Sequence, residues 1–158
     1  MVKNKSKKKF NKYSVALVFV LTLITVATLF LNSVCSESIV GARLEFSGLQ
    51  IAFGYAENSG MISVQILGFS IMAFLAYLLP IVGAILFWGV KGANKLLGLV
   101  SFVCFLASAV LMVLMPNFVI LASTGNAIEG LSLGIGAIIG ACVSALNALI
   151  VVVKTFVK

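Results

Sequence analysis

Apolar residues are grouped in this chain into four long runs, and short polar segments separate the runs. The runs cover residues 13–34, 67–90, 96–115 and 131–153, and none of them contains a charged side chain. A helix needs about 20 predominantly apolar residues to cross the roughly 30 Å of hydrocarbon in a bilayer. The pattern therefore predicts four membrane-spanning helices.

A different pattern lies between the first two runs, where apolar and polar positions alternate over residues 40–46 and again over residues 49–55. A period of two is typical of a strand with one apolar face, and Ser47-Gly48 between the two segments is a turn signal. The alternating pattern therefore predicts a β-hairpin in this loop. The alternative is an amphipathic helix at the membrane interface. Its apolar positions form the candidate outer recognition surface: Leu44, Phe46, Leu49, Ile51, Phe53 and Tyr55.

Asn58-Ser59-Gly60 is a second turn signal in the same loop. The residues that follow it, 61–66, either add a third strand or begin the second helix early. The expected fold class is thus an all-α membrane protein: a four-span transmembrane helix bundle with a small extracytoplasmic β-hairpin in the first outer loop. Residues 1–12 form a basic cytoplasmic tail, and residues 13–158 form a single domain.

Composition agrees with a membrane protein, because 62% of the 158 residues are hydrophobic and 9% are charged. A soluble domain of this composition would expose large apolar patches. The net charge of +7 does not indicate nucleic-acid binding, because six of the eleven basic residues lie in the first twelve positions, without a folded basic surface. Such a cluster favours anionic lipid headgroups as its partner. The lysines of this cluster are Lys3, Lys5, Lys7, Lys8, Lys9 and Lys12.

The remaining charges predict an orientation, because membrane proteins keep lysine and arginine mainly on the cytoplasmic side. With the N-terminus inside, the inner segments also hold Lys91, Lys95, Lys154 and Lys158, and the outer loops hold only Arg43 among the basic residues. All four acidic residues then lie outside. We therefore predict a multi-pass plasma-membrane protein with both termini cytoplasmic. The excess of lysine over arginine favours a bacterial membrane.

The first run has an alternative interpretation as a cleavable secretory signal, because basic residues precede it and small residues surround Cys35. Residues 15–31, however, are all apolar or threonine. A core of that length exceeds the about 7–15 residues of a signal peptide. We therefore expect an uncleaved anchor. Cleavage would leave three spans with the same orientation.

Small residues recur every four positions along the last run. A stripe of this kind lets another backbone approach closely inside a membrane. It predicts a tight contact either with another helix of the chain or with a second protein. The stripe consists of Gly136, Gly140, Ser144 and Ala148.

Polar side chains fall near one side of the first, third and last runs, at helical spacing. Where these faces converge, they form a polar seam, which either bonds the helices to one another or lines a path for a small neutral solute. In the second run, Pro80 predicts a helix kink. The seam comprises Thr22, Thr25, Thr28, Asn32, Ser101, Ser108 and Asn147, with Cys104 and Ser144 on the same faces.

The candidate chemistry for catalysis is sparse. The chain has no histidine and no aspartate, and its four glutamates are dispersed. They compose no metal-ligand cluster and no nucleophile–base pair. We therefore expect neither an enzyme nor a cofactor site.

The plan of four spans, a strand-bearing first outer loop and a short second one is similar to that of claudin-type tetraspans. The tryptophan and paired cysteines that mark the first outer loop of that family are absent here. The resemblance is one of topology and implies no function.

Two hypotheses for the function follow. The first is a non-catalytic accessory or scaffold component that binds another membrane protein through the stripe and the hairpin. The second is a homo-oligomeric pore or carrier for a neutral or weakly polar solute, with the seam as its path.

Overall fold

The computed structural model describes residues 2–37, 43–59, 62–89, 95–120, 122 and 130–156, and it is mostly helical. Four of its helices are long and apolar enough to cross a membrane, as the apolar runs predict. The apolar part of the first helix continues into a 3-10 helix, η1 (Thr28–Phe30). The long helices are α1 (Val2–Ala27), α3 (Ile71–Gly89), α4 (Lys95–Val113) and α5 (Ile135–Phe156).

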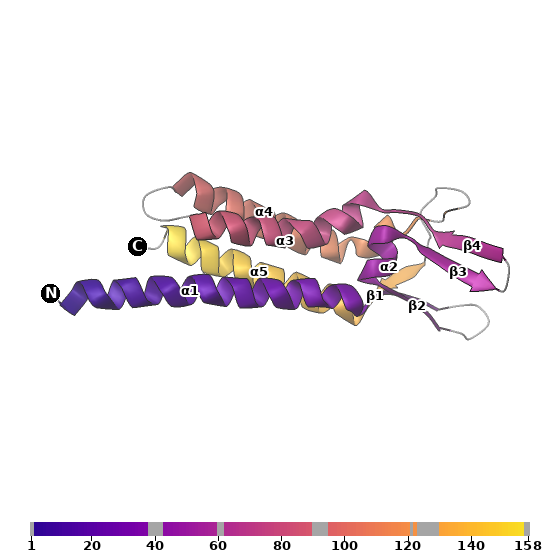
Figure 1. Ribbon diagram of the computed structural model, residues 1–158, viewed down its shortest axis with the longest axis horizontal. Helices are drawn as coiled ribbons and strands as arrows, with labels where there is room; N and C mark the ends of the chain where they lie inside the picture. The colour runs from indigo at the N-terminus through magenta and orange to yellow at the C-terminus, as the bar shows by residue number, and fades with distance from the viewer. Residues whose placement is uncertain are drawn as a thin grey trace.

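The long helices lie side by side in one bundle, and both chain termini are at the same end of it (Figure 1). α3 packs on α1 and α4, and α5 packs on α4 and α1, so that the helices form a closed ring. The N-terminal turns of α1 extend beyond the other helices (Figure 1). The lysine-rich segment is therefore the start of the same helix as the first apolar run.

Short strands and one short helix lie at the opposite end of the bundle, and we call them together the cap (Figure 1). β1 is the central strand of an antiparallel sheet with the order β2-β1-β5, and β3 pairs antiparallel with β4. The cap thus joins the segment before α3 to the segment before α5. Its elements are β1 (Asn32–Glu37), β2 (Arg43–Ser47), α2 (Gly48–Phe53), β3 (Tyr55–Ser59), β4 (Ile62–Leu67) and β5 (Leu131–Leu133).

Backbone hydrogen bonds connect the cap to the segment that follows α4 and the 3-10 helix η2 (Met115–Phe118). The Gly68 N–H donates to the Ile120 carbonyl over 2.8 Å, and the Ala122 N–H donates to the Ile66 carbonyl over 3.1 Å. The chain after α4 therefore runs beside the end of β4.

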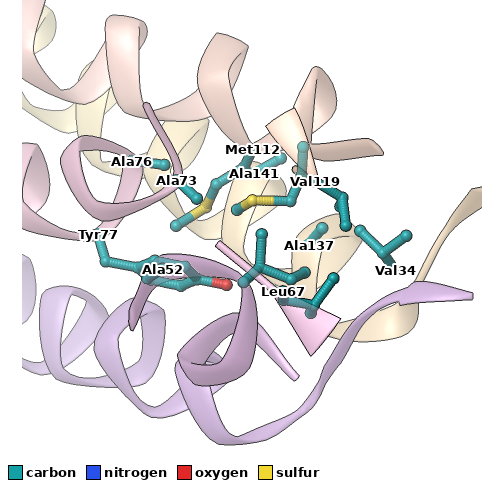
Figure 2. Packing of buried hydrophobic residues seen from close by; sticks show 12 residues of the cluster. Val34, Ala52, Leu67, Ala73, Ala76, Tyr77, Met112, Val119, Ala137 and Ala141 are labelled. Carbon is teal, nitrogen blue, oxygen red and sulfur yellow. The ribbon is translucent and has the colours of Figure 1, made fainter. Parts of the chain in front are cut away.

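Buried apolar side chains form two clusters. The larger cluster lies where the cap meets the bundle, and Figure 2 shows Val34 of β1, Leu67 of β4, Tyr77 of α3 and Met112 of α4 converging there. The smaller cluster, which includes Phe87, lies nearer the termini. Burying a large apolar side chain stabilises a fold by about 1.5–3 kcal/mol relative to exposure to water. The larger cluster thus fixes the cap on the helix ends.

The predicted hairpin over residues 40–55 is wrong, because the residues after Ser47 form helix α2 instead of a strand. The Gln50 N–H donates to Ser47 Oγ over 3.3 Å, and the Ser47 N–H donates to Gln50 Oε1 over 2.9 Å. This capping box satisfies two N–H groups at the helix start. Gly54, with a φ of +86°, follows the last helical residue. These local hydrogen bonds therefore start a helix at Gly48, although the alternating pattern predicts a strand.

The strands of the loop pair differently from the prediction. β2 pairs with β1, and of the two alternatives for residues 61–66 the structure shows a strand over Ile62–Leu67; Met61 lies outside the described residues. β1 begins inside the first apolar run, and β5 begins the last one. Each of those two runs therefore covers a membrane-length helix together with strand residues at its cap end, which hydrophobicity alone does not separate.

α3 continues through Pro80, which is buried in the bundle. A proline removes one backbone donor from a helix and clashes with the preceding turn. The bend that this predicts at Pro80 stays a prediction, while the helix itself is uninterrupted.

Candidate functional site

The stripe of small residues on α5 is buried inside the bundle. A Cβ atom placed on Gly140 would lie 2.6 Å from Met112 Sδ and 2.9 Å from Thr28 Oγ1. A Cβ atom placed on Gly136 would lie 2.9 Å from Leu31 Cβ. Of the two partners that the sequence leaves open, the stripe therefore meets the same chain: it contacts α4, η1 and the residue that follows η1. The buried stripe residues are Gly136, Gly140, Ser144 and Ala148.

Two fully buried serines of α4 connect three helices. Ser101 Oγ donates to the Gly83 carbonyl of α3, and Ser108 Oγ donates to the Ala76 carbonyl of α3, each over 2.7 Å. Ser108 Oγ also lies 3.3 Å from Ser144 Oγ of α5. Hydrogen bonds between membrane helices contribute about 0.6–2 kcal/mol each. These serines therefore stabilise the contacts of α4 with both of its neighbours.

The seam threonines of α1 and η1 are also buried. Each donates its hydroxyl hydrogen to a carbonyl of α1 three or four residues earlier in the chain, over distances of 2.7–3.2 Å. Asn147 Nδ2 of α5 donates to Thr22 Oγ1 over 3.4 Å, which links α5 to α1. The structure therefore brings together seam residues from three helices. The threonines are Thr22, Thr25 and Thr28.

Asn32 lies outside this seam, contrary to the sequence prediction. It is the first residue of β1, and its side-chain amide donates to the Glu45 carboxylate of β2. The first helix ends earlier than the apolar run, so position 32 no longer shares a face with the threonines.

Two polar atoms of α5 are buried without a hydrogen-bond partner among the residues that the structure describes: Asn147 Oδ1 and Thr155 Oγ1. Leaving a buried acceptor unpaired costs about 1–3 kcal/mol. Sequence reasoning missed Thr155, although it lies on the same face as the stripe at helical spacing from Ala148. Asn147 is therefore the seam residue whose polar group is least satisfied.

A hydroxyl cluster at the cap end was also missed. Tyr77 Oη of α3 lies 2.9 Å from Ser33 Oγ of β1 and hydrogen-bonds to Thr28 as well. Gly48 leaves room for the ring, because a Cβ atom there would lie 2.7 Å from Tyr77 Cζ. Ser33 and Tyr77 are 44 positions apart, so no spacing in the sequence reveals their contact. The cluster ties α3 to η1 and to the cap.

The residues predicted as one outer recognition surface do not share a face. Ile51 is buried in the larger cluster, while Leu49 and Phe53 are exposed. The prediction assumed strand geometry, and a helix turns positions 49 and 51 to different sides. The side chain of Leu44 lies outside the described part of the structure. The remaining two, Phe46 and Tyr55, are half-buried against the larger cluster.

Within the described ranges, no three histidine, cysteine, aspartate or glutamate side chains gather to hold a metal ion. Cys35, Cys104 and Cys142 are free thiols. The chemistry that the described residues bring together is therefore that of neutral hydroxyl and amide groups inside a bundle, with a folded cap at one end.

The chain matches no protein-family model, and no curated protein or solved structure is significantly similar to it. The topological similarity to claudin-type tetraspans stays a prediction. A proposal for the function therefore depends on the bundle and the cap themselves.

Proposed function

We propose that the chain is a non-catalytic, multi-pass component of the plasma membrane that binds another protein of that membrane through its cap. The observation that carries this proposal is the sheet of the cap and its edge strand. Two segments far apart in the sequence form one sheet, in which β2 is an edge strand with β1 as its partner. An edge strand presents backbone groups that can pair with another chain.

The charges support an orientation with the cap outside the cell. Lys95 begins α4 and Lys154 lies in the last turn of α5, so both belong to the end of the bundle that holds the termini (Figure 1). The N-terminal lysines begin α1 at the same end. Basic residues concentrate on the cytoplasmic side of membrane proteins, where anionic lipids attract them. Both termini are thus proposed to be cytoplasmic.

The internal packing supports the choice of the cap over the stripe as the contact surface. The stripe on α5 faces Met112 and Thr28 of the same chain, and Ser108 and Ser144 face each other. A partner can reach these groups only by opening the bundle. The cap, in contrast, has an exposed charged residue, Glu45, on edge strand β2.

Reversing the charge at Glu45 is expected to reduce recovery of the bound partner at least about tenfold, because a charge at the rim of an interface governs association. The tagged chain would be purified from native membranes in mild detergent. A second protein present in equal amount would be identified by mass spectrometry, and its binding would be remeasured with purified components. The variant is Glu45→Arg.

Glu45→Gln is the matched control, because it retains an oxygen that accepts from Asn32. The proposal fails if Glu45→Arg binds the partner as well as the native chain does. It also fails if the native chain purifies only as a homo-oligomer.

A second candidate is a homo-oligomeric pore or carrier for a neutral or weakly polar solute, and Asn147 favours it. Its Oδ1 atom is a buried acceptor without a partner among the described residues. Polar sites of this kind bind water or other small donors when there is room for them.

The pore hypothesis predicts that Thr25→Val lowers the flux of glycerol into proteoliposomes several-fold. Thr25 Oγ1 donates to a carbonyl of its own helix over 3.2 Å, so valine keeps the shape and should leave assembly intact. Stopped-flow light scattering measures the flux, and size-exclusion chromatography checks the assembly. Unchanged flux would favour a purely structural role for the seam.

A further inference from the structure

Helix α2 is not one of the four membrane-length helices, yet it carries apolar side chains both on the side that faces the bundle and on its exposed side. Its inner side, which includes Ile51 and Ala52, is buried in the larger cluster. Its outer side carries Leu49, 39% exposed, and Phe53, 56% exposed. These two residues are four positions apart and therefore adjacent on one helix face. The polar residue of α2, Gln50, belongs to the capping box at the helix start, and a contiguous exposed apolar patch marks a contact with lipid or with another protein.

The outer face of α2 continues into other exposed apolar side chains. α2 packs on η1, where Phe30 is 71% exposed, and on the start of α3, where Phe69 is 53% exposed just before the helix. The Phe53 and Phe74 rings lie edge to face with centroids 5.6 Å apart, and the Phe74 and Phe69 centroids are 6.2 Å apart. We call this band the collar. Its exposed members are Phe30, Leu49, Phe53, Phe69 and Met72.

No charged residue interrupts the collar. Residues 28–34, 47–54 and 66–74 contain neither acidic nor basic side chains. The described charged residues of the cap, such as Glu45, belong to its strands. The collar is therefore an apolar belt between the bundle and the polar part of the cap.

The length of α3 gives the depth at which the collar would lie in a bilayer. α3 has 19 residues, which at 1.5 Å per residue is roughly 28 Å, close to the roughly 30 Å of bilayer hydrocarbon. When α3 fills the hydrocarbon, its first residue, Ile71, lies at one boundary. The collar, which packs beside that residue, then lies at the same boundary.

A second aromatic group marks the other boundary. Trp88, next to the last residue of α3, is 58% exposed, and its ring lies edge to face against Phe19 of α1 at 5.6 Å. Membrane proteins carry aromatic belts at both lipid–water boundaries. Trp88 and the collar therefore bracket α3 as two such belts.

From these observations we infer that the collar is embedded in the cap-side leaflet, with α2 lying as an interfacial helix at the boundary between headgroups and acyl chains. The occupant of the Leu49–Phe53 face is lipid. Interfacial helices bind in this way, with their apolar face in the boundary region. The strands of the cap then stand above the headgroups. This inference rests on the proposed membrane insertion and is independent of the proposed partner.

The test uses a single tryptophan as a depth probe in the full chain. The chain has one native tryptophan, so Trp88→Phe provides the background into which Phe53→Trp is introduced. The protein is reconstituted in phosphatidylcholine vesicles with lipids brominated either near the top or near the end of the acyl chain. We expect the lipids brominated near the top to quench Phe53→Trp most strongly and aqueous iodide to quench it weakly.

Two further variants calibrate the depth scale. Leu106→Trp lies in the lipid-facing middle of α4, and Glu45→Trp lies on exposed strand β2. We expect deep bromines to quench the first and iodide to quench the second. If Leu106→Trp escapes both brominated lipids, membrane insertion itself fails, which distinguishes that failure from failure of the collar.

Two results would overturn the inference while Leu106→Trp behaves as expected. Strong quenching of Phe53→Trp by iodide would place the collar in water. Resistance to iodide and to both brominated lipids would mean that protein, such as a second copy of the chain, covers the face. If Phe53→Trp does not fold, Leu49→Trp probes the same face with the same outcomes.

Discussion

Replacing Gly134 with alanine is expected to lower the melting temperature of the purified chain by about 6–12 °C. Gly134 joins β5 to α5, and its N–H donates to the Ser33 carbonyl of β1 over 2.8 Å. A Cβ atom there would lie 2.7 Å from the Ser33 carbonyl carbon and 2.8 Å from that of Asn32. Overpacking lowers the free energy of unfolding by about 1–3 kcal/mol or more. The loss should be at the upper end here, because backbone atoms cannot rotate away from the new Cβ atom as a side chain could. About 3 kcal/mol corresponds to that temperature shift in a chain of this size.

The shift can be measured by thermal unfolding in detergent, followed by size-exclusion chromatography. Gly89→Ala is the matched control, since a Cβ atom there would meet no described residue within 4 Å beyond its chain neighbours and its own helix backbone. We expect the control to melt like the native chain. Native-like melting of Gly134→Ala would contradict the close approach of β1 and α5.

Gly140→Leu is expected to prevent the bundle from closing. Leucine would collide with Met112 Sδ and Thr28 Oγ1, and both residues are buried. Since leucine adds several carbon atoms to a filled interior, the variant should lose at least about 3 kcal/mol of its free energy of unfolding. Fluorescence-detected size-exclusion chromatography should show the loss of the monodisperse peak. Were the stripe a surface for a second protein, the variant would instead fold normally and lose only its partner.

A second substitution tests whether Gly140 packs directly against Met112. Met112→Ala removes the thioether that stands 2.6 Å from the position of the new Cβ atom. The double variant Gly140→Leu/Met112→Ala nearly conserves volume, and such exchanges are tolerated best. We therefore expect it to recover part of the lost stability, although Met112→Ala alone destabilises the chain. Additive losses would show that the two positions do not touch.

The four long helices could be predicted because their signal is local. Run length and the absence of charge decide whether a segment can cross a bilayer, and both can be counted along the chain. The ends of the helices could not be predicted in this way. Residues 32–34 and 131–133 lie inside uncharged runs, but they form strand instead of helix because β1 and β5 pair with each other across about a hundred positions of the chain.

The loop before α3 shows two local signals in competition. Alternation over residues 49–55 predicts a strand, whereas Ser47 and Gln50 form a capping box that begins a helix. The Ser-x-x-Gln spacing is visible in the sequence and was the better guide. Because a helix turns its residues to all sides, Ile51 entered the core and Leu49 and Phe53 remained outside.

Among the candidate site residues, the small stripe and the hydroxyl positions were identifiable, but their partners were not. Gly140 could have met any backbone, and only the packed bundle shows that it meets Met112 and Thr28. The contact between Tyr77 and Ser33 depends on where α3 begins and where β1 begins, which no spacing encodes.

The sequence by itself determined that this chain has four helices able to cross a membrane, because hydrophobic length is a property of consecutive residues. It also determined where the charged segments stand along the chain, and from them an expected orientation. Only the tertiary structure decided that the stripe is satisfied within one chain, that the cap is a sheet of two distant segments, and that α2 keeps an exposed apolar face. These outcomes depend on which surfaces meet, and contacts between distant residues are set by the packing of the whole chain.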